Sequence, residues 1–95
     1  MTEHTKEQAV GVVRDYFRKI GVAAVEVTRG TIRTGDSLRF VGHTTDLVQR
    51  IESMQANYHD VLEASKGDYV GIKVADRVRE GDLVYIESGK TEDLL

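Results

Sequence analysis

The chain has 95 residues, with 13 Lys and Arg against 16 Asp and Glu, and it contains neither Cys nor Pro. This length suits one domain, and the formal net charge of −3 argues against a protein that coats nucleic acid without sequence preference. The absence of Cys excludes disulfides and thiolate metal sites and fits a reducing, cytoplasmic location. No apolar run is long enough to cross a membrane, and the polar start is unlike a signal peptide.

Short β-branched segments alternate with turn residues along the chain. In residues 22–28, Ala23, Val25 and Val27 share one face, and residues 69–75 alternate in the same way. This is the period of a half-buried strand. Many short strands with frequent turns predict an all-β barrel or sandwich. The predicted extended segments are residues 9–16, 22–28, 37–41, 46–54, 69–75 and 83–87.

Residues 45–58 fit two interpretations. Leu47, Ile51, Met54 and Tyr58 have the spacing of one face of a helix. As a strand, the same segment needs a bulge. Periodicity alone favours the helix, but we predict a strand over residues 46–54 because of the family resemblance given below.

Three Gly-Asp steps each precede an apolar strand start: Gly35-Asp36, Gly67-Asp68 and Gly81-Asp82. Gly suits a turn residue with positive φ, and the Asp carboxylate can accept backbone N–H bonds. Their unequal separations indicate repeated turn chemistry rather than an internal repeat. We expect one domain over residues 8–87, with flexible ends at residues 1–7 and 88–95.

The order of several short motifs resembles a known family. They are Gly11-Val12-Val13, residues 22–27 (VAAVEV), 30–36 (GTIRTGD), 64–72 (ASKGDYVGI) and 78–84 (VREGDLV). Together they resemble the β-barrel second domain of translational GTPases such as elongation factor Tu, and a similar barrel is joined to collagenase-like peptidases. The resemblance implies a small closed antiparallel barrel of six or seven strands, with hairpin turns at residues 18–21 and 30–35.

The motifs that could carry catalysis are incomplete. Residues 30–37 have the glycine spacing of a phosphate-binding loop, but Asp36 stands where that loop needs a Lys. The GTPase domain of the resembled family is absent, so GTP hydrolysis does not carry over. His4, His43 and His59 have no metal-ligand spacing. We therefore predict a protein that is not an enzyme and that has no cofactor or metal site.

Charge is distributed unevenly along the chain. Residues 8–42 contain six basic and three acidic residues, whereas residues 43–95 contain six basic and eleven acidic ones. Barrels of the resembled family contact tRNA or ribosomal RNA, and the resemblance places Glu52 on a pocket carboxylate, although a strand carboxylate facing solvent is an equal alternative. The first hypothesis is contact with RNA or a ribonucleoprotein, with no DNA or membrane partner. The residues expected to carry it are Arg14, Arg18, Lys19, Arg29, Arg33 and Glu52.

The second hypothesis is a protein-interaction module related to the barrel joined to collagenase-like peptidases. Here the apolar loop residues Phe17, Ile20, Tyr58 and Leu62 dock on a protein partner or on a second copy of the chain. Fold class alone does not choose between the two hypotheses.

Overall fold

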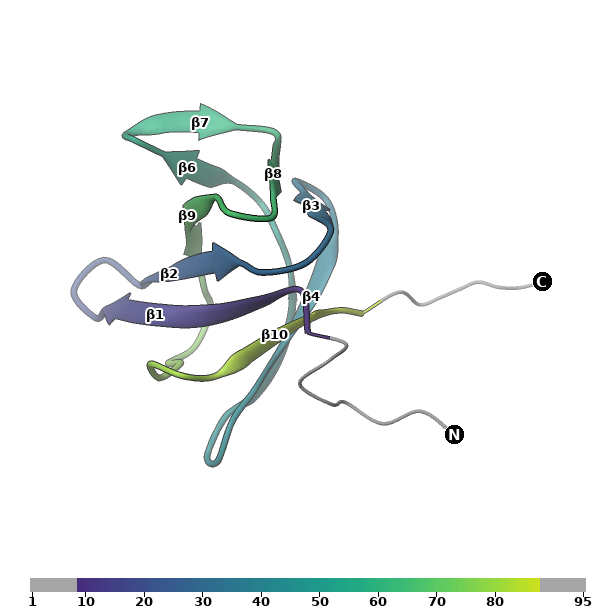
Figure 1. Ribbon diagram of the computed structural model, residues 1–95. Helices are drawn as coiled ribbons and strands as arrows, with labels where there is room; N and C mark the ends of the chain where they lie inside the picture. Colours follow the sequence, from purple (N-terminus) through teal and green to yellow (C-terminus); the bar gives the residue numbers. More distant parts are fainter. Residues whose placement is uncertain (1–8, 88–95) are drawn as a thin grey trace.

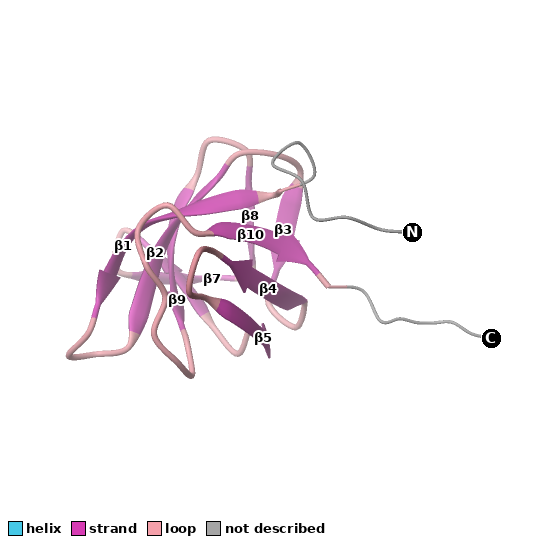
Figure 2. Cartoon of the chain, turned by 90° about the horizontal axis from the view of Figure 1, so that it is seen from below, coloured by secondary structure: helices cyan, strands magenta, loops and turns pink. Residues whose placement is uncertain are grey.

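The computed structural model describes residues 9–87, and every regular element among them is a β-strand (Figures 1 and 2). The all-β prediction is confirmed for these residues. The predictions for residues 1–7 and 88–95, and for His4, lie outside the described residues. The strands are β1 (Gly11–Phe17), β2 (Val22–Val27), β3 (Thr31–Arg33), β4 (Ser37–Val41), β5 (Asp46–Arg50), β6 (Met54–Ala56), β7 (His59–Val61), β8 (Glu63–Ser65), β9 (Tyr69–Lys73) and β10 (Leu83–Ile86).

Eight of the strands form one curled sheet in the order β5-β4-β10-β1-β2-β9-β6-β7, and β3 pairs with β8 in a separate ribbon (Figure 1). All described pairings are antiparallel. The expected closed barrel of six or seven strands differs from this arrangement, since β5 and β7 are the two ends of the sheet. The number of strands is larger for two reasons. Residues 54–65, which show no clear strand period in the sequence, fold into three short strands, and residues 31–33, expected to lie in a turn, form β3.

The two predicted hairpin turns have different outcomes. The first is confirmed, because β1 pairs with β2 and the N–H of Gly21 donates to the carbonyl oxygen of Phe17 at 2.8 Å. The second, at residues 30–35, is wrong. Those residues contain β3, which pairs with β8, and β2 pairs with β9 on its other side.

The core follows the predicted alternation in the longer strands. Ala23, Val25 and Val27 on β2 are all buried, as are Leu38 and Phe40 on β4. Each buried Val, Leu or Phe side chain stabilises the fold by about 1.5–3 kcal/mol. Apolar residues from both the curled sheet and the β3–β8 ribbon join in one cluster, so the ribbon closes over the core.

The segment with helical spacing is extended. β5 ends at Arg50 and β6 begins at Met54, with no strand at residues 51–53. Ile51 and Met54 are three residues apart and both buried, because the chain changes course between the two strands. The strand prediction for residues 46–54 is therefore right up to Arg50, and the apparent helical period comes from a break in a strand.

The three Gly-Asp steps form the same turn. In each, the Asp N–H donates to the carbonyl oxygen three residues earlier, and an Asp side-chain oxygen accepts the N–H of that same residue. The Gly before the Asp has a φ of 95–100° in all three turns, where a side chain would strain the backbone. The carboxylate therefore acts as the expected acceptor in each of the three turns.

In one of these turns the Asp side chain is buried against the turn between β4 and β5. Asp82 is only 5% exposed, and its Oδ2 accepts the Arg79 N–H at 2.8 Å. Its other oxygen faces the α-carbon of Gly42, so closely that a Cβ on Gly42 would overlap it. Position 42 therefore requires a Gly, because the Asp82 carboxylate leaves no room for a Cβ.

The side chain of Gln49 spans the opening between β5 and the end of β9. Its Nε2 donates to the carbonyl oxygen of Lys73 at 2.8 Å, and its Oε1 accepts the N–H of Ala75 at 2.7 Å. These are the bonds that a paired strand would make with the same backbone. One amide side chain therefore joins the sheet to itself where strand pairing stops.

Candidate functional site

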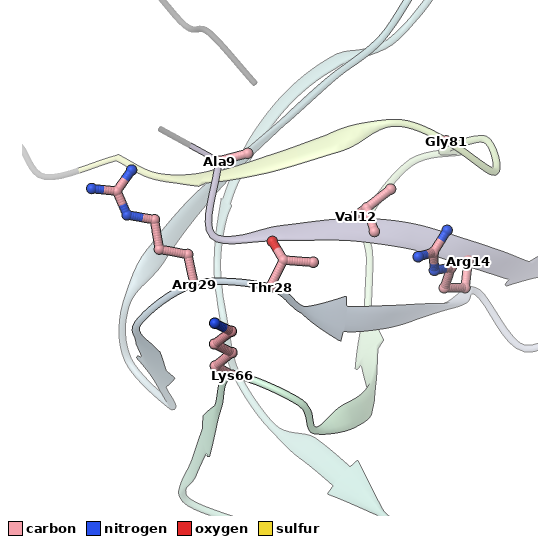
Figure 3. A pocket seen from close by; sticks show the side chains of 7 residues that line it. All are labelled: Ala9, Val12, Arg14, Thr28, Arg29, Lys66 and Gly81. Atoms are coloured by element: carbon pink, nitrogen blue, oxygen red, sulfur yellow. The ribbon is translucent and has the colours of Figure 1, made fainter. Parts of the chain in front are cut away.

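A groove lined by basic residues crosses the outer face of β1 (Figure 3). It has a volume of about 730 Å³ and is open to solvent. Arg29 and Lys66 stand at one end, Arg14 stands toward the other, and Val12 and Thr28 lie between them. We call it the basic groove; its lining is Ala9, Val12, Arg14, Thr28, Arg29, Lys66 and Gly81.

Local backbone geometry places each of the three cations. Arg14 is the extra residue of an irregularity in β1, where Val13 pairs with Val25 and Asp15 pairs with Ala24. Arg29 follows the end of β2, and its N–H donates to the carbonyl oxygen of Val10 at 3.2 Å. Lys66 lies in the Gly-Asp turn between β8 and β9. Three separate segments thus bring positive charge to one groove.

Arg14 is held by a carboxylate beside the groove. Its Nε and Nη2 donate to Glu26 Oε1 at 2.8 and 2.6 Å. These hydrogen bonds, together with the negative charge of Glu26, raise the pKa of Arg14 above its ordinary value. Among the described residues that line the groove, none is acidic, and Lys66 makes no ion pair with any residue of 9–87.

A second groove, of about 350 Å³, lies where the β1–β2 and β6–β7 hairpins approach each other. Its floor includes Ala24 and Gly71, which face each other across β2 and β9. Phe17, Tyr58 and Tyr69 line it and are 46%, 97% and 59% exposed. We call these three rings the aromatic surface.

Tyr58 occupies an unfavourable backbone conformation. It and Asn57 join β6 to β7 with φ values of 68° and 53°, which is the left-handed region at both central positions of a two-residue hairpin loop. Asn is common there, but a bulky residue is an outlier, and Gly is usual at the second position. The hairpin therefore accepts strain while it presents a fully exposed ring.

The predicted RNA-contact residues are scattered. Arg14 and Arg29 meet in the basic groove, whereas Arg18 and Lys19 lie in the turn at the far end of β1. Arg33 on β3 pairs with Glu63 at 3.3 Å. Arg39 on β4, a basic residue outside the predicted set, binds Asp46 and Glu87, and its hydrogen bonds to Asp46 raise the pKa of Arg39. The structure describes no single basic face made of the predicted set.

The other predicted site residues fall in separate places. Glu52 is exposed between β5 and β6 and does not line the basic groove. Lys66, which does line it, was not among the predicted residues because 37 positions separate it from Arg29. The signal that could have found it is the turn motif around Gly67-Asp68, which fixes the place of its neighbour Lys66.

The structure also places the segment that resembles a phosphate-binding loop. Residues 30–37 contain β3 and a Gly-Asp turn, and the Asp36 carboxylate accepts the Arg33 N–H at 2.9 Å. Within residues 9–87, no three His, Asp or Glu side chains gather as metal ligands would. The described part of the chain also has no helix that is long and apolar enough to cross a membrane.

Comparison with known proteins identifies the family. Residues 21–91 match the model of elongation factor Tu domain 2. The chain belongs to the elongation factor Tu domain 2 family. The barrel resemblance seen in the sequence is therefore confirmed.

The curated relatives are proteases. The chain is 40% identical over 78 residues to an uncharacterised protease of Methanocaldococcus jannaschii, covering 81% of this chain and 19% of that protein. It is 34% identical over 77 residues to a collagenase of Porphyromonas gingivalis, covering 80% of this chain and 21% of the collagenase. The chain thus spans about a fifth of the length of these relatives.

A solved structure agrees in fold. The C-terminal domain of a protein from Geobacillus thermoleovorans, described as a U32 peptidase, superimposes with a TM-score of 0.81 at 23% identity. The match covers 92% of this chain and 100% of that domain. This chain and that domain therefore share one fold.

Proposed function

We propose that this member of the elongation factor Tu domain 2 family is a protein-interaction module without catalytic activity, related to the C-terminal domains of peptidases. The observation that carries the proposal is the aromatic surface, where three exposed rings surround a floor of small residues. Aromatic side chains supply large contact area and are enriched at protein interfaces. The relatives, in which similar sequences form a fifth of longer proteases, support an accessory role.

Two features of the surface favour a protein partner over RNA. Ile20 and Leu62 are also exposed, at 61% and 79%, so apolar side chains other than the three rings are accessible to a partner. The cations expected to contact phosphate are dispersed, and Arg14 and Arg33 are held in ion pairs. RNA contact depends on basic residues that lie close together along a track. A cytoplasmic location stays a prediction from the sequence.

The proposal is tested by affinity capture of the tagged protein with and without ribonuclease. The captured proteins are identified by mass spectrometry, and the affinity for the purified partner is then measured. We expect one protein partner to survive ribonuclease, and the changes Phe17→Ser and Tyr58→Ser each to weaken its binding by about tenfold or more.

The matched control is Val48→Ser, an exposed apolar residue on β5 that does not line the aromatic groove. We expect this control to bind its partner normally. Capture that disappears after ribonuclease would contradict the proposal and favour the RNA hypothesis. If all three variants weakened partner binding equally, the aromatic surface would not be the binding site.

A further inference from the structure

The groove of the aromatic surface adjoins another groove, of about 330 Å³, beside the start of β9. Asn57, Tyr69 and Val70 line both, so the two grooves meet at these residues. Of the two grooves, Glu63 and Asp68 line only the second. We call the two grooves together the Tyr69 recess, which has rings toward one end and carboxylates toward the other.

The carboxylates of the Tyr69 recess can bind a cation. Asp68 is fixed in place because its Oδ2 accepts the N–H of Ser65 at 2.9 Å, and a carboxylate has further lone pairs beyond the one used there. Glu63 pairs with Arg33 at 3.3 Å, and the two side chains are 59% and 62% exposed. Since water screens such an exposed pair, Arg33 competes only weakly for the Glu63 carboxylate.

The rings of the recess suit an Arg side chain. Tyr58 and Tyr69 are 97% and 59% exposed, so ring surface is accessible on both. The face of an aromatic ring attracts cations, and the planar guanidinium of Arg both stacks on rings and forms paired hydrogen bonds with carboxylates. Tyr69 directly follows Asp68 in the chain, and both line the second groove. One Arg side chain can therefore contact a ring and a carboxylate together.

The floor of the recess determines how a segment can be held there. Ala24 pairs with β1 and β9, and Gly71 pairs with β2 and β6, so both floor residues already have strands on either side. A partner segment cannot join the sheet at this point as an added strand, and its side chains must supply the contacts. The small floor residues leave room between Phe17 and Tyr58 for an apolar side chain.

We infer that the Tyr69 recess binds an extended basic segment of the protein partner. An Arg of that segment stacks on Tyr69, with its guanidinium beside Asp68 and Glu63. A neighbouring apolar side chain of the segment lies between Phe17 and Tyr58. The inference rests on the proposed function, because it names the chemistry of the segment that the aromatic surface contacts. Charge complementarity supports a basic segment, since the same two carboxylates would repel an acidic segment or the phosphates of RNA.

The test uses a fluorescent synthetic peptide in which Arg alternates with Leu, and a matched peptide in which neutral citrulline replaces Arg. Binding to the full chain is measured by fluorescence anisotropy at low and high salt. We expect the Arg peptide to bind about tenfold or more tightly than the citrulline peptide. Salt should weaken the binding of the Arg peptide, because the carboxylates of the recess are exposed.

Three variants locate the binding, and thermal unfolding checks that each is folded. Glu63→Lys should lower the affinity for the Arg peptide by about tenfold or more, since attraction becomes repulsion. Tyr69→Leu keeps an apolar side chain but removes the aromatic face, and should lower the affinity by about two- to fivefold. The matched control is Glu80→Lys, which makes the same charge change at an exposed position that lines neither groove of the recess. We expect it to bind the Arg peptide almost normally.

Equal effects of Glu63→Lys and Glu80→Lys would overturn the inference, because only net charge would then matter. Equal binding of both peptides, binding of neither, or unchanged binding by Tyr69→Leu would also overturn it. So would a short oligouridylate that binds more tightly than the Arg peptide. The peptide assay needs no captured partner, and Glu63 is not among the residues that test the proposed function. The inference can therefore fail while the proposed function holds, and failure of the capture experiment is seen separately.

Discussion

Two regions of the curled sheet are held together in different ways. We call them the wall, which is formed by β4, β10, β1, β2 and β9, and the seam, which lies between β5 and the end of β9. In the wall, each strand pairs with its neighbours through a backbone ladder, and β1 and β2 stay paired along almost their whole length. At the seam, the side chain of Gln49 replaces the ladder. The wall therefore depends on close approach of backbones, and the seam depends on one side chain.

The two grooves also differ in how the backbone beneath them is held. The basic groove lies across β1 and β2, in the wall, where the turns that flank it are fixed by Asp side chains. The aromatic surface lies where the wall meets the short β6–β7 hairpin, and Tyr58 stands at the tip of that hairpin in a strained conformation. The cations of the basic groove thus lie at a strand irregularity, a strand end and a hydrogen-bonded turn, and the most exposed ring lies at a strained hairpin tip.

The largest effect is expected where the wall is packed most closely. In Gly42→Ala, the new Cβ would overlap the side chain of Asp82 and lie 2.6 Å from its Cγ. Because Asp82 is buried and bonded to the Arg79 N–H, it cannot move freely. We expect the free energy of unfolding to fall by about 2–3 kcal/mol, measured by urea denaturation.

The control for this change is Gly67→Ala. Gly67 has a positive φ of 98°, but a Cβ there would meet nothing within 4 Å. It isolates the cost of backbone strain, which we expect to be about 1 kcal/mol. If the two variants lost equal stability, crowding against Asp82 would not be the reason for a Gly at position 42.

An intermediate effect is expected at the seam. Gln49→Ala removes both bonds to the backbone of Lys73 and Ala75. Since the seam is open to water, we expect a loss of about 1 kcal/mol in the free energy of unfolding. Faster hydrogen exchange at the Ala75 N–H, measured by NMR, should accompany it, whereas amides in the middle of β2 should keep their protection.

Gln55→Ala is the matched control for the seam. Among residues 9–87, the Gln55 amide donates only to the exposed Asp60 carboxylate, at 3.1 Å, and bonds to no backbone group there. We expect it to leave Ala75 exchange unchanged. Equal exchange in the two variants would show that the opening is not closed by Gln49.

The smallest effect has the opposite sign. Tyr58→Gly relieves a positive φ of 68°, which costs an L-residue about 1–2 kcal/mol, and the greater freedom of Gly in the unfolded chain offsets part of the gain. We expect stability to rise by about 0.5 kcal/mol while partner binding falls. Thermal unfolding measures the first and partner affinity the second. A loss of stability would mean that the ring stabilises its own hairpin and is not kept for docking.

Much of the wall could be predicted from the sequence. The alternation of Ala23, Val25 and Val27 is local, because successive side chains of a strand point to opposite faces. The Gly-Asp turns are local as well, because each is closed by hydrogen bonds within four residues. Residues 51–65 could not be divided correctly, because Ile51 and Met54 are both buried across a break that no periodic pattern describes.

The sequence by itself determined the all-β class, the turn chemistry and the membership of a barrel family, because these depend on neighbours along the chain. Only the tertiary structure decided which strands meet, that Gln49 spans the opening, and that Lys66 joins Arg14 and Arg29 in one groove. The physical reason is that curling of the sheet sets distances between residues far apart in the chain. No local pattern encodes those distances, and the candidate binding surfaces depend on them because their residues come from separate parts of the chain.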